Sequence, residues 1–241
     1  MLKPNNIYQG DCLELMKGIP DNSIDLVFTS PPYNFGGVSI YKKLGKKYSN
    51  YDDNMKPLQY YKWLDERLIE MIRISRLTFL NIQMLSGNKD ALFSIIGNYK
   101  KYLKEIIIWN KINSEPAISK NVLNSQFEFI LVFSNTNNKR KFDVCNFRRG
   151  RLSNLWNIHK NYKFNLKGHH AIMSIDLAIK VIDNFSKTND LILDPFLGSG
   201  TTAVACKQLG RRYIGIEISK EYCKISEDRI RKTKACNNEY F

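Results

Sequence analysis

The sequence predicts an α/β fold with a mostly parallel, seven-stranded sheet that is covered by helices on both faces. Its short apolar runs are mostly continuous rather than alternating, which is typical of strands buried on both faces. Helical patterns lie between several of these runs, as in folds with a parallel sheet. The chain has 241 residues, 43% of them hydrophobic, which suffices for a large core. We therefore expect a single domain over residues 1–241.

Each strand is predicted from a short apolar run that polar or turn residues bound. The predicted strands cover residues 6–9, 24–28, 79–84, 105–109, 128–133, 191–193 and 213–216. The clearest helical patterns cover residues 57–74, 174–185 and 219–232. The second and third of these helices begin at Ser174 and Ser219, and serine is a preferred N-cap residue.

The composition favours a polyanionic partner. The formal net charge is +14, a surplus that usually indicates nucleic acid or a membrane surface, with a Lys- and Asn-rich proteome as the alternative. Five cysteines without a C-x-x-C pair and three histidines argue against a metal site or a disulfide framework, and favour a reducing, cytoplasmic location close to the nucleoid. We find no signal-peptide pattern and no run near the roughly 18 apolar residues that span a bilayer.

Two long polar stretches, 35–54 and 135–170, interrupt the alternation of strands and helices. Loops of this length in a compact domain are usually functional. Residues 139–167 contain nine Lys or Arg and one acid, with aromatic residues such as Phe142, Phe147 and Trp156 between them. This mixture favours nucleic-acid binding by an insert at about 135–168, while a solvated face is the alternative. The basic residues that we predict to contact the polyanion are Lys42, Lys43, Lys139, Arg140, Lys141, Arg148, Arg149 and Arg151.

A glycine-rich turn near the end of the chain indicates a nucleoside cofactor. Residues 191–206 read as a strand, a turn and a helix, and Gly198, Gly200 and Ala203 fit the G-x-G-x-x-G/A pattern. Glu217 follows 19 residues after Gly198, at the end of the next predicted strand. In such units the glycines let the backbone approach the ligand, and the acid binds ribose hydroxyls. The pattern alone does not separate a dinucleotide from S-adenosylmethionine, and a tight turn without a ligand is the alternative.

The place of this unit in the chain predicts a permuted order of strands. Only one helical pattern follows Glu217, so the remaining strands of a nucleotide-binding sheet must come from earlier in the chain. Dehydrogenases usually begin with this unit instead. The ligand crevice of such folds lies at the carboxyl ends of the strands, where the strand order reverses.

The segment TSPPYN, which follows the predicted strand at residues 24–28, predicts a rigid turn at the same edge of the sheet. Pro31 and Pro32 lack N–H groups and have a fixed φ, so neither continues a central strand. The carboxyl end of this strand and the glycine turn can therefore face one crevice. A turn with Tyr33 packed in the core is the alternative.

The two motifs together resemble the β-class of S-adenosylmethionine-dependent DNA amino-methyltransferases, in which a Pro-Pro-Tyr motif precedes an F-x-G-x-G motif. The resemblance covers nearly the whole chain except the basic insert. It implies a Rossmann-like methyltransferase fold, with Ser30, Pro31, Pro32 and Tyr33 as catalytic residues. It also implies a cofactor site made by Asp11, Cys12, His170, Ala171, Asp194, Pro195, Phe196, Gly198, Ser199, Gly200, Thr201, Thr202 and Glu217.

The chemistry of amine methylation explains these residue types. An exocyclic base amine is a weak nucleophile because its lone pair is delocalised into the ring. Two acceptors aimed at its hydrogens, Ser30 Oγ and the Pro31 carbonyl, would favour the pyramidal nitrogen and stabilise its growing positive charge. The target base must leave the duplex, and stacking on Tyr33 would offset part of that cost. This scheme needs no metal and no covalent intermediate, and Cys12 is not the expected nucleophile.

The resemblance favours cytosine-N4 over adenine-N6 as the target, because Ser-Pro-Pro-Tyr accompanies cytosine methylation more often in the family. The expected substrate is double-stranded DNA with the target base flipped out. The expected partner is a cognate restriction endonuclease, for a monomer or homodimer. RNA or a protein glutamine is an alternative substrate, but those relatives usually have the motifs in the opposite order. A non-catalytic DNA-binding scaffold is a further alternative.

Overall fold

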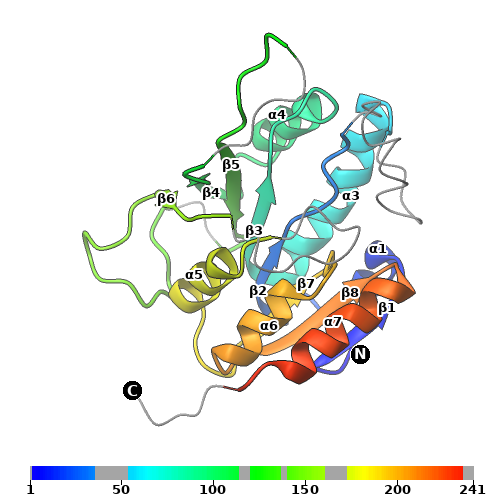
Figure 1. Cartoon of the computed structure of the whole chain (residues 1–241), viewed down its shortest axis with the longest axis vertical. Coiled ribbons are helices and arrows are strands. Elements are labelled where there is room, and N and C mark those ends of the chain that lie inside the picture. Colours follow the sequence, from blue (N-terminus) through cyan, green and yellow to red (C-terminus); the bar gives the residue numbers. More distant parts are fainter. Residues whose placement is uncertain (1, 36–53, 114–119, 137–139, 161–172, 236–241) are drawn as a thin grey trace.

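The computed structural model of the chain is a single sheet with helices on both faces (Figure 1). It describes residues 2–35, 54–113, 120–136, 140–160 and 173–235. The elements follow in the order β1 (Asn6–Gln9), α1 (Cys12–Lys17), β2 (Ile24–Thr29), α3 (Pro57–Ile74), β3 (Ser75–Ile82), α4 (Lys89–Asn98), β4 (Leu103–Asn110), β5 (Phe127–Phe133), β6 (Leu155–Asn157), α5 (Ile175–Phe185), β7 (Leu191–Asp194), α6 (Thr201–Gln208), β8 (Arg212–Glu217) and α7 (Lys220–Lys232).

The sheet has the permuted order that the glycine turn predicted. Its strands lie in the order β1-β8-β7-β2-β3-β5-β4-β6. Among the described strands, β5 runs antiparallel to β3 and β4, and all other neighbours are parallel. From β7 the chain moves toward β8, whereas from β2 it moves toward β3, so the order reverses between β7 and β2. This reversal is where open α/β sheets form their ligand crevice.

The predicted count of seven strands was too low, because the described residues form eight. The additional strand, β6, lies within the basic insert and pairs with β4. It has only three residues, of which only Trp156 is buried. A strand of this length is too short to give a periodic signal in the sequence. Strand β3 also begins at Ser75 rather than at residue 79, because α3 ends at Ile74 and the chain continues directly into the sheet.

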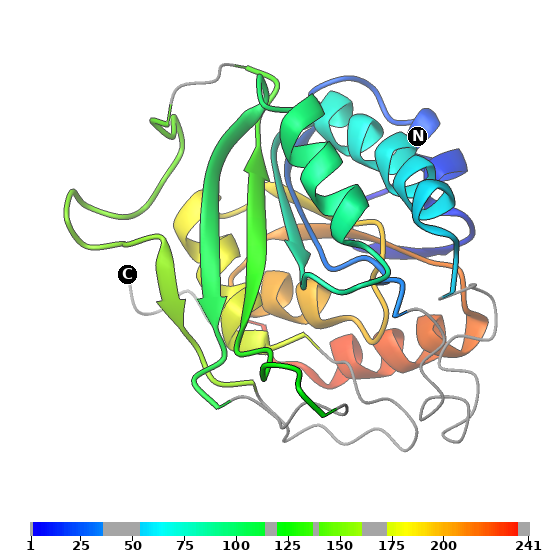
Figure 2. The same ribbon diagram turned by 90° about the horizontal axis from the view of Figure 1, so that it is seen from above.

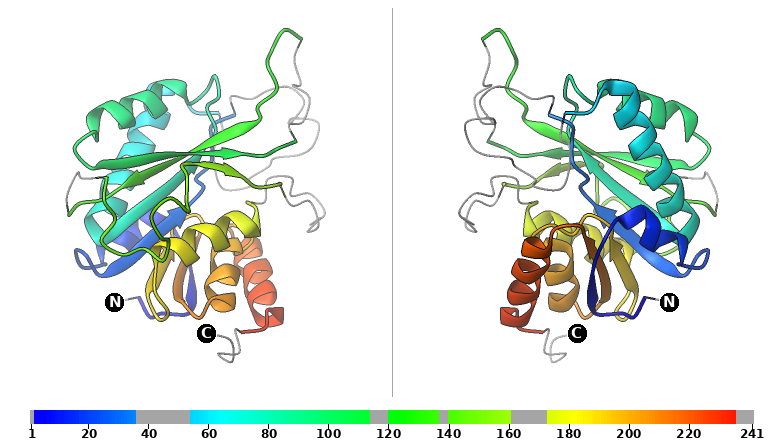
Figure 3. Two further views of the ribbon diagram at one scale, coloured as in Figure 1. Left: turned by 90° about the vertical axis from the view of Figure 1, so that its left-hand side faces the viewer. Right: turned by 90° about the vertical axis from the view of Figure 1, so that its right-hand side faces the viewer.

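Two apolar cores lie on opposite faces of the sheet. Helices α1, α3 and α4 cover one face, where Leu64, Leu92 and Val27 belong to the same buried core. Helices α5 and α6 cover the other face, where Val181 packs with Phe28 in the second core. The views in Figures 2 and 3 show these helix layers on either side of the strands. The prediction that helices cover both faces is confirmed.

Three described aromatic residues of the basic insert pack in or against the second core. Phe142 and Phe147 lie 4.9 and 5.5 Å from the ring of Phe185, measured between ring centroids, and Trp156 is 1% exposed. Their alternation with basic residues had favoured nucleic-acid binding. These three rings contact Phe185 of α5, with Trp156 buried and Phe142 and Phe147 partly buried. Nucleic-acid binding by the insert stays a prediction.

The two predicted N-cap residues do lie at the N-caps, but only one of them caps with its side chain. Ser219 Oγ accepts a hydrogen bond from the Tyr222 N–H at 3.4 Å. Ser174 precedes α5, but its hydroxyl donates to the His159 carbonyl at 3.3 Å instead. Within the described ranges, no helix is long and apolar enough to cross a bilayer.

Candidate active site

The two sequence motifs lie side by side at the carboxyl edge of the sheet. Strands β2 and β7 are parallel neighbours, with Val27 opposite Leu193. At their ends the Thr29 hydroxyl donates a hydrogen bond of 2.6 Å to Asp194 Oδ1. The predicted juxtaposition of the Pro-Pro-Tyr turn and the glycine turn is therefore confirmed. A buried hydrogen bond ties their supporting strands together.

Hydrogen bonds from α3 and from the segment before α4 hold the turn at Ser30–Tyr33 in place. The Tyr60 hydroxyl donates to the Pro32 carbonyl at 2.7 Å, and Asn88 Nδ2 donates to the Tyr33 carbonyl at 2.8 Å. No described residue donates a hydrogen bond to the Pro31 carbonyl. This carbonyl therefore keeps its acceptor capacity, as the chemistry of amine methylation requires.

Asn34 closes the turn with a left-handed backbone, at φ +56°. Its buried side-chain amide donates to the Gly87 carbonyl at 2.7 Å and to the Met55 carbonyl at 2.9 Å. The backbone at Gly87 approaches so closely that an added Cβ would lie 2.1 Å from the Asn34 carbonyl oxygen. Only glycine fits there without displacing the turn.

The hydroxyls of Ser30 and Tyr33 lie 2.7 Å apart, and the Tyr33 hydroxyl also lies 2.9 Å from Glu128 Oε2. Burial raises the pKa of Tyr33 well above its ordinary value, and the nearby Glu128 charge acts in the same direction. The phenol is therefore neutral at physiological pH. The tyrosine ring is held by its hydroxyl as well as by its backbone.

The glycine turn has the backbone that its sequence predicts. Gly198 and Gly200 adopt φ of +52° and +85°, which favour glycine. A Cβ on Gly200 would lie 2.6 Å from the Ser226 side chain, so glycine also lets α6 approach α7. The Gly198 N–H donates to Glu217 Oε2 at 2.8 Å, and the Ser219 N–H donates to Oε1 at the same distance. Burial raises the pKa of Glu217, against the effect of these bonds.

Most predicted cofactor residues of this turn are buried. Asp194 accepts hydrogen bonds from Thr29, Thr202 and the Phe196 N–H, and burial raises its pKa to about 6. Arg229 of α7 donates to the hydroxyls of Ser199 and Thr201, at 2.7 and 3.3 Å. The other buried cofactor candidates of this turn are Pro195, Ser199, Gly200, Thr201 and Thr202. The partly accessible ones are Phe196 and Gly198. A ligand would meet this turn first at Phe196 and Gly198.

Helix α3 adds side chains that the sequence analysis missed. Asp11 caps α1, and its second oxygen forms an ion pair of 2.9 Å with Arg67. Arg67 also lies 4.5 Å from the ring of Trp63, and Trp63 lies 5.4 Å from the ring of Phe196. An arginine on the apolar stripe of the helix, between Leu64 and Met71, was the available signal.

Cys12 lies in the first turn of α1, where it is 5% exposed. Burial raises the pKa of its thiol to about 12, although Arg67 acts in the opposite direction. A thiol needs its ionised form to attack a carbon. The geometry therefore agrees with the expectation that Cys12 is not a nucleophile.

None of the predicted DNA-binding residues that the structure describes forms a hydrogen bond or ion pair with the residues of this site. Lys42, Lys43 and Lys139 lie outside the described residues, as do the cofactor candidates His170 and Ala171. Arg140 forms an ion pair with Glu105 near the start of β4, and the side chains of Lys141, Arg148, Arg149 and Arg151 are exposed.

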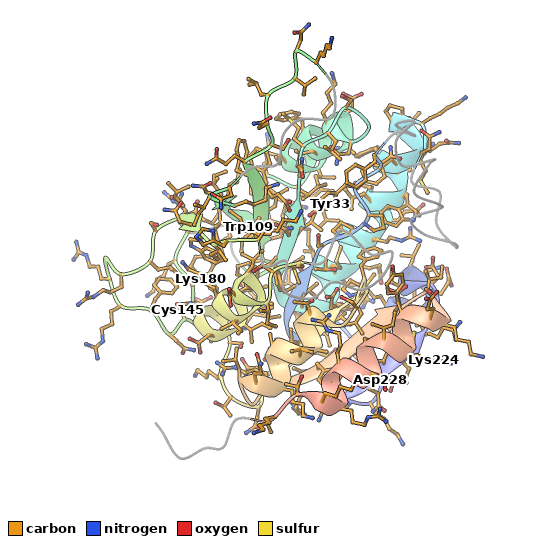
Figure 4. The ribbon with its side chains drawn as sticks, in the orientation of Figure 1. Tyr33, Trp109, Cys145, Lys180, Lys224 and Asp228 are labelled. Atoms are coloured by element: carbon orange, nitrogen blue, oxygen red, sulfur yellow. The ribbon has the colours of Figure 1, made fainter. Side chains whose placement is uncertain are left out.

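The direction of β4 places the first part of the insert at the amino edge of the sheet. Asn110 pairs with Phe127 at the carboxyl edge, and Leu103 pairs with Phe133 at the opposite end. Asn146 is bonded to the last turn of α5, also at the amino edge. In Figure 4, Cys145 lies beside α5 and well away from Tyr33. DNA contacts by these arginines stay a prediction that this geometry does not favour.

A sequence model of the DNA methylase family, which covers adenine-N6 and cytosine-N4 enzymes, matches residues 24–228. The chain belongs to this family. It is 31% identical to the type II methyltransferase M.HinfI of Haemophilus influenzae, over 98% of this chain and 70% of that protein. It is 29% identical to the type II methyltransferase M2.MboI of Moraxella bovis, over 98% of this chain and 91% of that protein.

Solved structures of methyltransferases share the fold. The cytosine-N4-specific PvuII DNA methyltransferase has a TM-score of 0.73 at 21% identity, over 95% of this chain and 87% of that one. M1.HpyAVI in complex with S-adenosylmethionine has a TM-score of 0.62 at 23% identity, over 93% and 98% of the two chains. The expected Rossmann-like methyltransferase fold is confirmed.

The family uses S-adenosylmethionine, and the residues at the crevice fit this cofactor. Glu217 offers a carboxylate beside the glycine turn, and Phe196 and Trp63 offer aromatic faces for an adenine. Arg67 Nε is buried without a hydrogen-bond partner among the described residues, which leaves a donor for a ligand. In the described part of the chain no three His, Cys, Asp or Glu residues are arranged to hold a metal ion.

Proposed function

We propose that this DNA amino-methyltransferase is site-specific and methylates N4 of cytosine in preference to N6 of adenine. The observation that carries the proposal is the Ser-Pro-Pro-Tyr turn at the carboxyl end of β2, next to the glycine turn that follows β7. A serine rather than an aspartate at position 30 favours cytosine. The rigid support of this turn by Tyr60, Asn88 and Gly87 favours an active enzyme over a binding scaffold.

The turn provides two acceptors for one amine. When bound, S-adenosylmethionine supplies an electrophilic methyl group on a sulfonium centre. Ser30 Oγ and the Pro31 carbonyl accept the two amine hydrogens and turn the nitrogen lone pair toward that methyl group. The proline-restricted backbone holds both oxygens without reorganisation during the reaction. The ring of Tyr33 stacks on the flipped base.

The cofactor residues divide into those that touch the ligand and those that shape its site. Glu217 binds the ribose hydroxyls, Asp11 lies at the adenine, and Phe196 and Gly198 line the path between them. Asp194, Thr202 and Arg229 hold the turn from behind, because their polar atoms bond to the turn and to each other rather than to the crevice.

The substrate is double-stranded DNA that docks over the carboxyl edge of the sheet, with the target base flipped into the crevice. Flipping costs a few kcal/mol, and stacking on an aromatic ring returns roughly 1–3 kcal/mol. Because the relatives are named type II methyltransferases, we propose that the enzyme protects DNA from a cognate endonuclease. It acts as a monomer or homodimer.

Expression of the chain in cells that lack DNA methylation tests this proposal. Nucleoside mass spectrometry of the DNA and RNA, with modification-sensitive sequencing, identifies the base and its context together. We expect N4-methylcytosine in one short sequence context. N6-methyladenine alone would contradict the choice of cytosine. Methylated RNA with unmodified DNA would contradict the choice of substrate.

Tyr33→Ala tests the stacking role of the tyrosine ring. This variant removes the ring, while the Pro32 carbonyl and the carbonyl of residue 33 can still accept the hydrogen bonds from Tyr60 and Asn88. We expect this variant to bind S-adenosylmethionine and lose most of its methylation. Wild-type protein that binds DNA but fails to bind the cofactor in a calorimetric titration would instead support a non-catalytic scaffold.

A further inference from the structure

A chain of buried polar side chains leads from Ser30 away from the crevice. Ser30 Oγ lies 2.7 Å from Tyr33 Oη, which lies 2.9 Å from Glu128 Oε2. The other carboxylate oxygen of Glu128 lies 3.3 Å from Lys111 Nζ. The side chains of Lys111 and Glu128 are only 8% and 9% exposed. Three separate elements therefore meet here, because Lys111 follows β4, Glu128 lies on β5 and the hydroxyls follow β2.

The donor and acceptor of each hydrogen bond in this network follow from the carboxylate of Glu128, at which the network ends. An ionised carboxylate only accepts hydrogen bonds, so the Tyr33 hydroxyl must donate to Glu128. That donation uses the single hydrogen of Tyr33, so the Ser30 hydroxyl must donate to Tyr33 Oη. The Ser30 hydrogen then points away from the crevice. Asn81 Nδ2 also lies 3.4 Å from Ser30 Oγ as a long donor, and the other lone pair of Ser30 Oγ remains for the amine of the target base.

Asn81 on β3 fixes this arrangement. Its Nδ2 donates to Tyr33 Oη and to Glu128 Oε2, both at 2.8 Å. The reverse amide orientation would place Oδ1 against the carboxylate oxygen, which is repulsive. In the observed orientation Asn81 Oδ1 is buried without a partner among the described residues, which costs roughly 1–3 kcal/mol. The hydrogen bonds from Asn81 to the Glu128 carboxylate and the Tyr33 phenol offset this cost.

We infer that Glu128 is the terminal proton acceptor for methylation of the target amine, reached through the hydroxyls of Ser30 and Tyr33. The inference rests on the proposed function, and it assigns roles to Glu128, Lys111 and Asn81 that the Ser-Pro-Pro-Tyr motif does not contain. Glu128 and Lys111 are positioning residues, because they act on the amine only through Tyr33 and Ser30.

The proton movements balance along this chain. As the amine nitrogen bonds to the methyl carbon, the carbon–sulfur bond breaks and its electron pair stays on sulfur. The positively charged nitrogen then gives one proton to Ser30 Oγ. Ser30 passes its own hydrogen to Tyr33 Oη, and Tyr33 passes its hydrogen to Glu128 Oε2. Both hydroxyls end with one hydrogen each, and Glu128 ends as a neutral acid.

Neighbouring residues hold Glu128 and Tyr33 at the far end of this hydrogen-bond network. Lys111 Nζ forms an ion pair with Glu128 Oε1, and the amide of Asn81 donates a hydrogen bond to Glu128 Oε2. Burial and the charge of Glu128 raise the pKa of Tyr33, and Tyr60 acts in the same direction. The phenol therefore transfers a proton only while it receives one from Ser30.

Two isosteric variants test the inference in single-turnover methylation with saturating DNA and cofactor. Tyr33→Phe keeps the stacking ring and removes the hydroxyl, and Glu128→Gln keeps the shape and removes the base. General acid–base groups contribute roughly 10²–10⁴-fold, so each variant should lose about 100-fold in rate while its affinity for DNA, measured separately by titration, is unchanged. The double variant should be no slower than the slower single variant, because both changes interrupt one chain.

Arg149→Ala is the matched control for additivity, because the Arg149 side chain is exposed and is not part of the hydrogen-bond network of Ser30, Tyr33 and Glu128. Its effect should multiply with that of Glu128→Gln. Effects of Tyr33→Phe and Glu128→Gln that also multiply would overturn the inference, as would a wild-type rate in Tyr33→Phe. If Glu128→Gln does not fold, the rate of Tyr33→Phe decides alone: a loss of about 100-fold supports the chain.

A measurement on the cofactor-free protein separates this inference from the proposed function. Fluorine NMR of protein that contains 3-fluorotyrosine follows the ionisation of Tyr33, whose signal is absent in Tyr33→Phe. Fluorination makes the phenol more acidic, which lowers the pH at which Tyr33 ionises. Because the charge of Glu128 opposes ionisation of Tyr33, the midpoint should fall in Glu128→Gln. An unchanged midpoint would overturn the inference, whereas wild-type protein that methylates no DNA would contradict the proposed function.

Discussion

The two edges of the sheet handle charge in opposite ways. At the carboxyl edge, Lys111 and Glu128 form an ion pair that is more than nine-tenths buried and that continues into Tyr33. At the amino edge, Arg140 pairs with Glu105 while its own side chain is 75% exposed. A buried polar group must find its partners within the protein, whereas an exposed one can use water. Partner loss should therefore be severe at the first edge and mild at the second.

The largest effect should follow from breaking the buried pair. Lys111→Met leaves Glu128 without its cation, and removal of one partner of a buried pair typically costs about 3–5 kcal/mol. Arg140→Met breaks the exposed pair and should leave the free energy of unfolding unchanged. Urea unfolding of both variants measures the difference. Equal losses would show that the two edges do not differ in this way.

A glycine substitution should come next, because it acts on the backbone that supports Tyr33. In Gly87→Ala the new Cβ would lie 2.1 Å from the Asn34 carbonyl oxygen, and we expect a loss of about 3 kcal/mol together with at least a tenfold loss of methylation. Gly97→Ala is the control, because its Cβ would meet nothing within 4 Å in α4. That variant should gain about 0.5–1 kcal/mol. Similar urea midpoints for the two variants would contradict the close approach.

The pH dependence of stability should reveal Asp194, whose pKa burial raises to about 6. A carboxyl group that binds its proton more tightly in the folded state stabilises the fold below its unfolded pKa, and this stabilisation is lost as the pH rises through about 6. On lowering the pH from 7.5 to 4, the wild type should gain on the order of 3 kcal/mol relative to Asp194→Asn. The raised pKa of Glu217 changes the stability of both proteins in the same direction, so its contribution cancels in the difference between them. Parallel melting-temperature profiles would rule out this ionisation.

The smallest effect should come from the exposed arginines of the insert. Replacing Arg148, Arg149 and Arg151 by alanine should leave kcat unchanged at saturating DNA, because their side chains are exposed and they follow Cys145, which lies well away from Tyr33 in Figure 4. Each lost phosphate contact lowers the slope of log K against log salt by about 0.9, and we expect a total change below that value. A change in slope that corresponds to about three contacts would show that these arginines contact the duplex, as the basic composition had predicted.

Most elements were predictable because their signals are local. The apolar run at 24–28, the prolines after it and the glycines at 198 and 200 each act through their own backbone conformation. Strand β6 was not predictable, because three residues carry no period and their pairing partner, β4, lies far away in the sequence. The contacts of Phe142 and Phe147 with α5 were not predictable for the same reason. Their burial depends on Phe185, which the sequence does not place beside them.

The site was predictable where its residues adjoin a motif. Ser30, Tyr33, Gly198 and Glu217 lie in or next to the segments that the sequence identified. Arg67, Asn81, Lys111 and Glu128 were missed, because each reaches the site only through the pairing of strands or the packing of α3. An isolated Lys or Glu at the end of an apolar run gives no sign of its partner.

The sequence by itself determined the family, the cofactor and the backbone of the two turns, because motif order and the conformations of proline and glycine are properties of short segments. Only the tertiary structure decided which side chains surround Ser30 and which edge of the sheet the insert occupies. The antiparallel pairing of β5 with β3 and β4 brings Lys111, Glu128 and Asn81 together. Strand register determines which side chain pairs with a buried charge. Register in turn depends on the whole sheet rather than on any one strand.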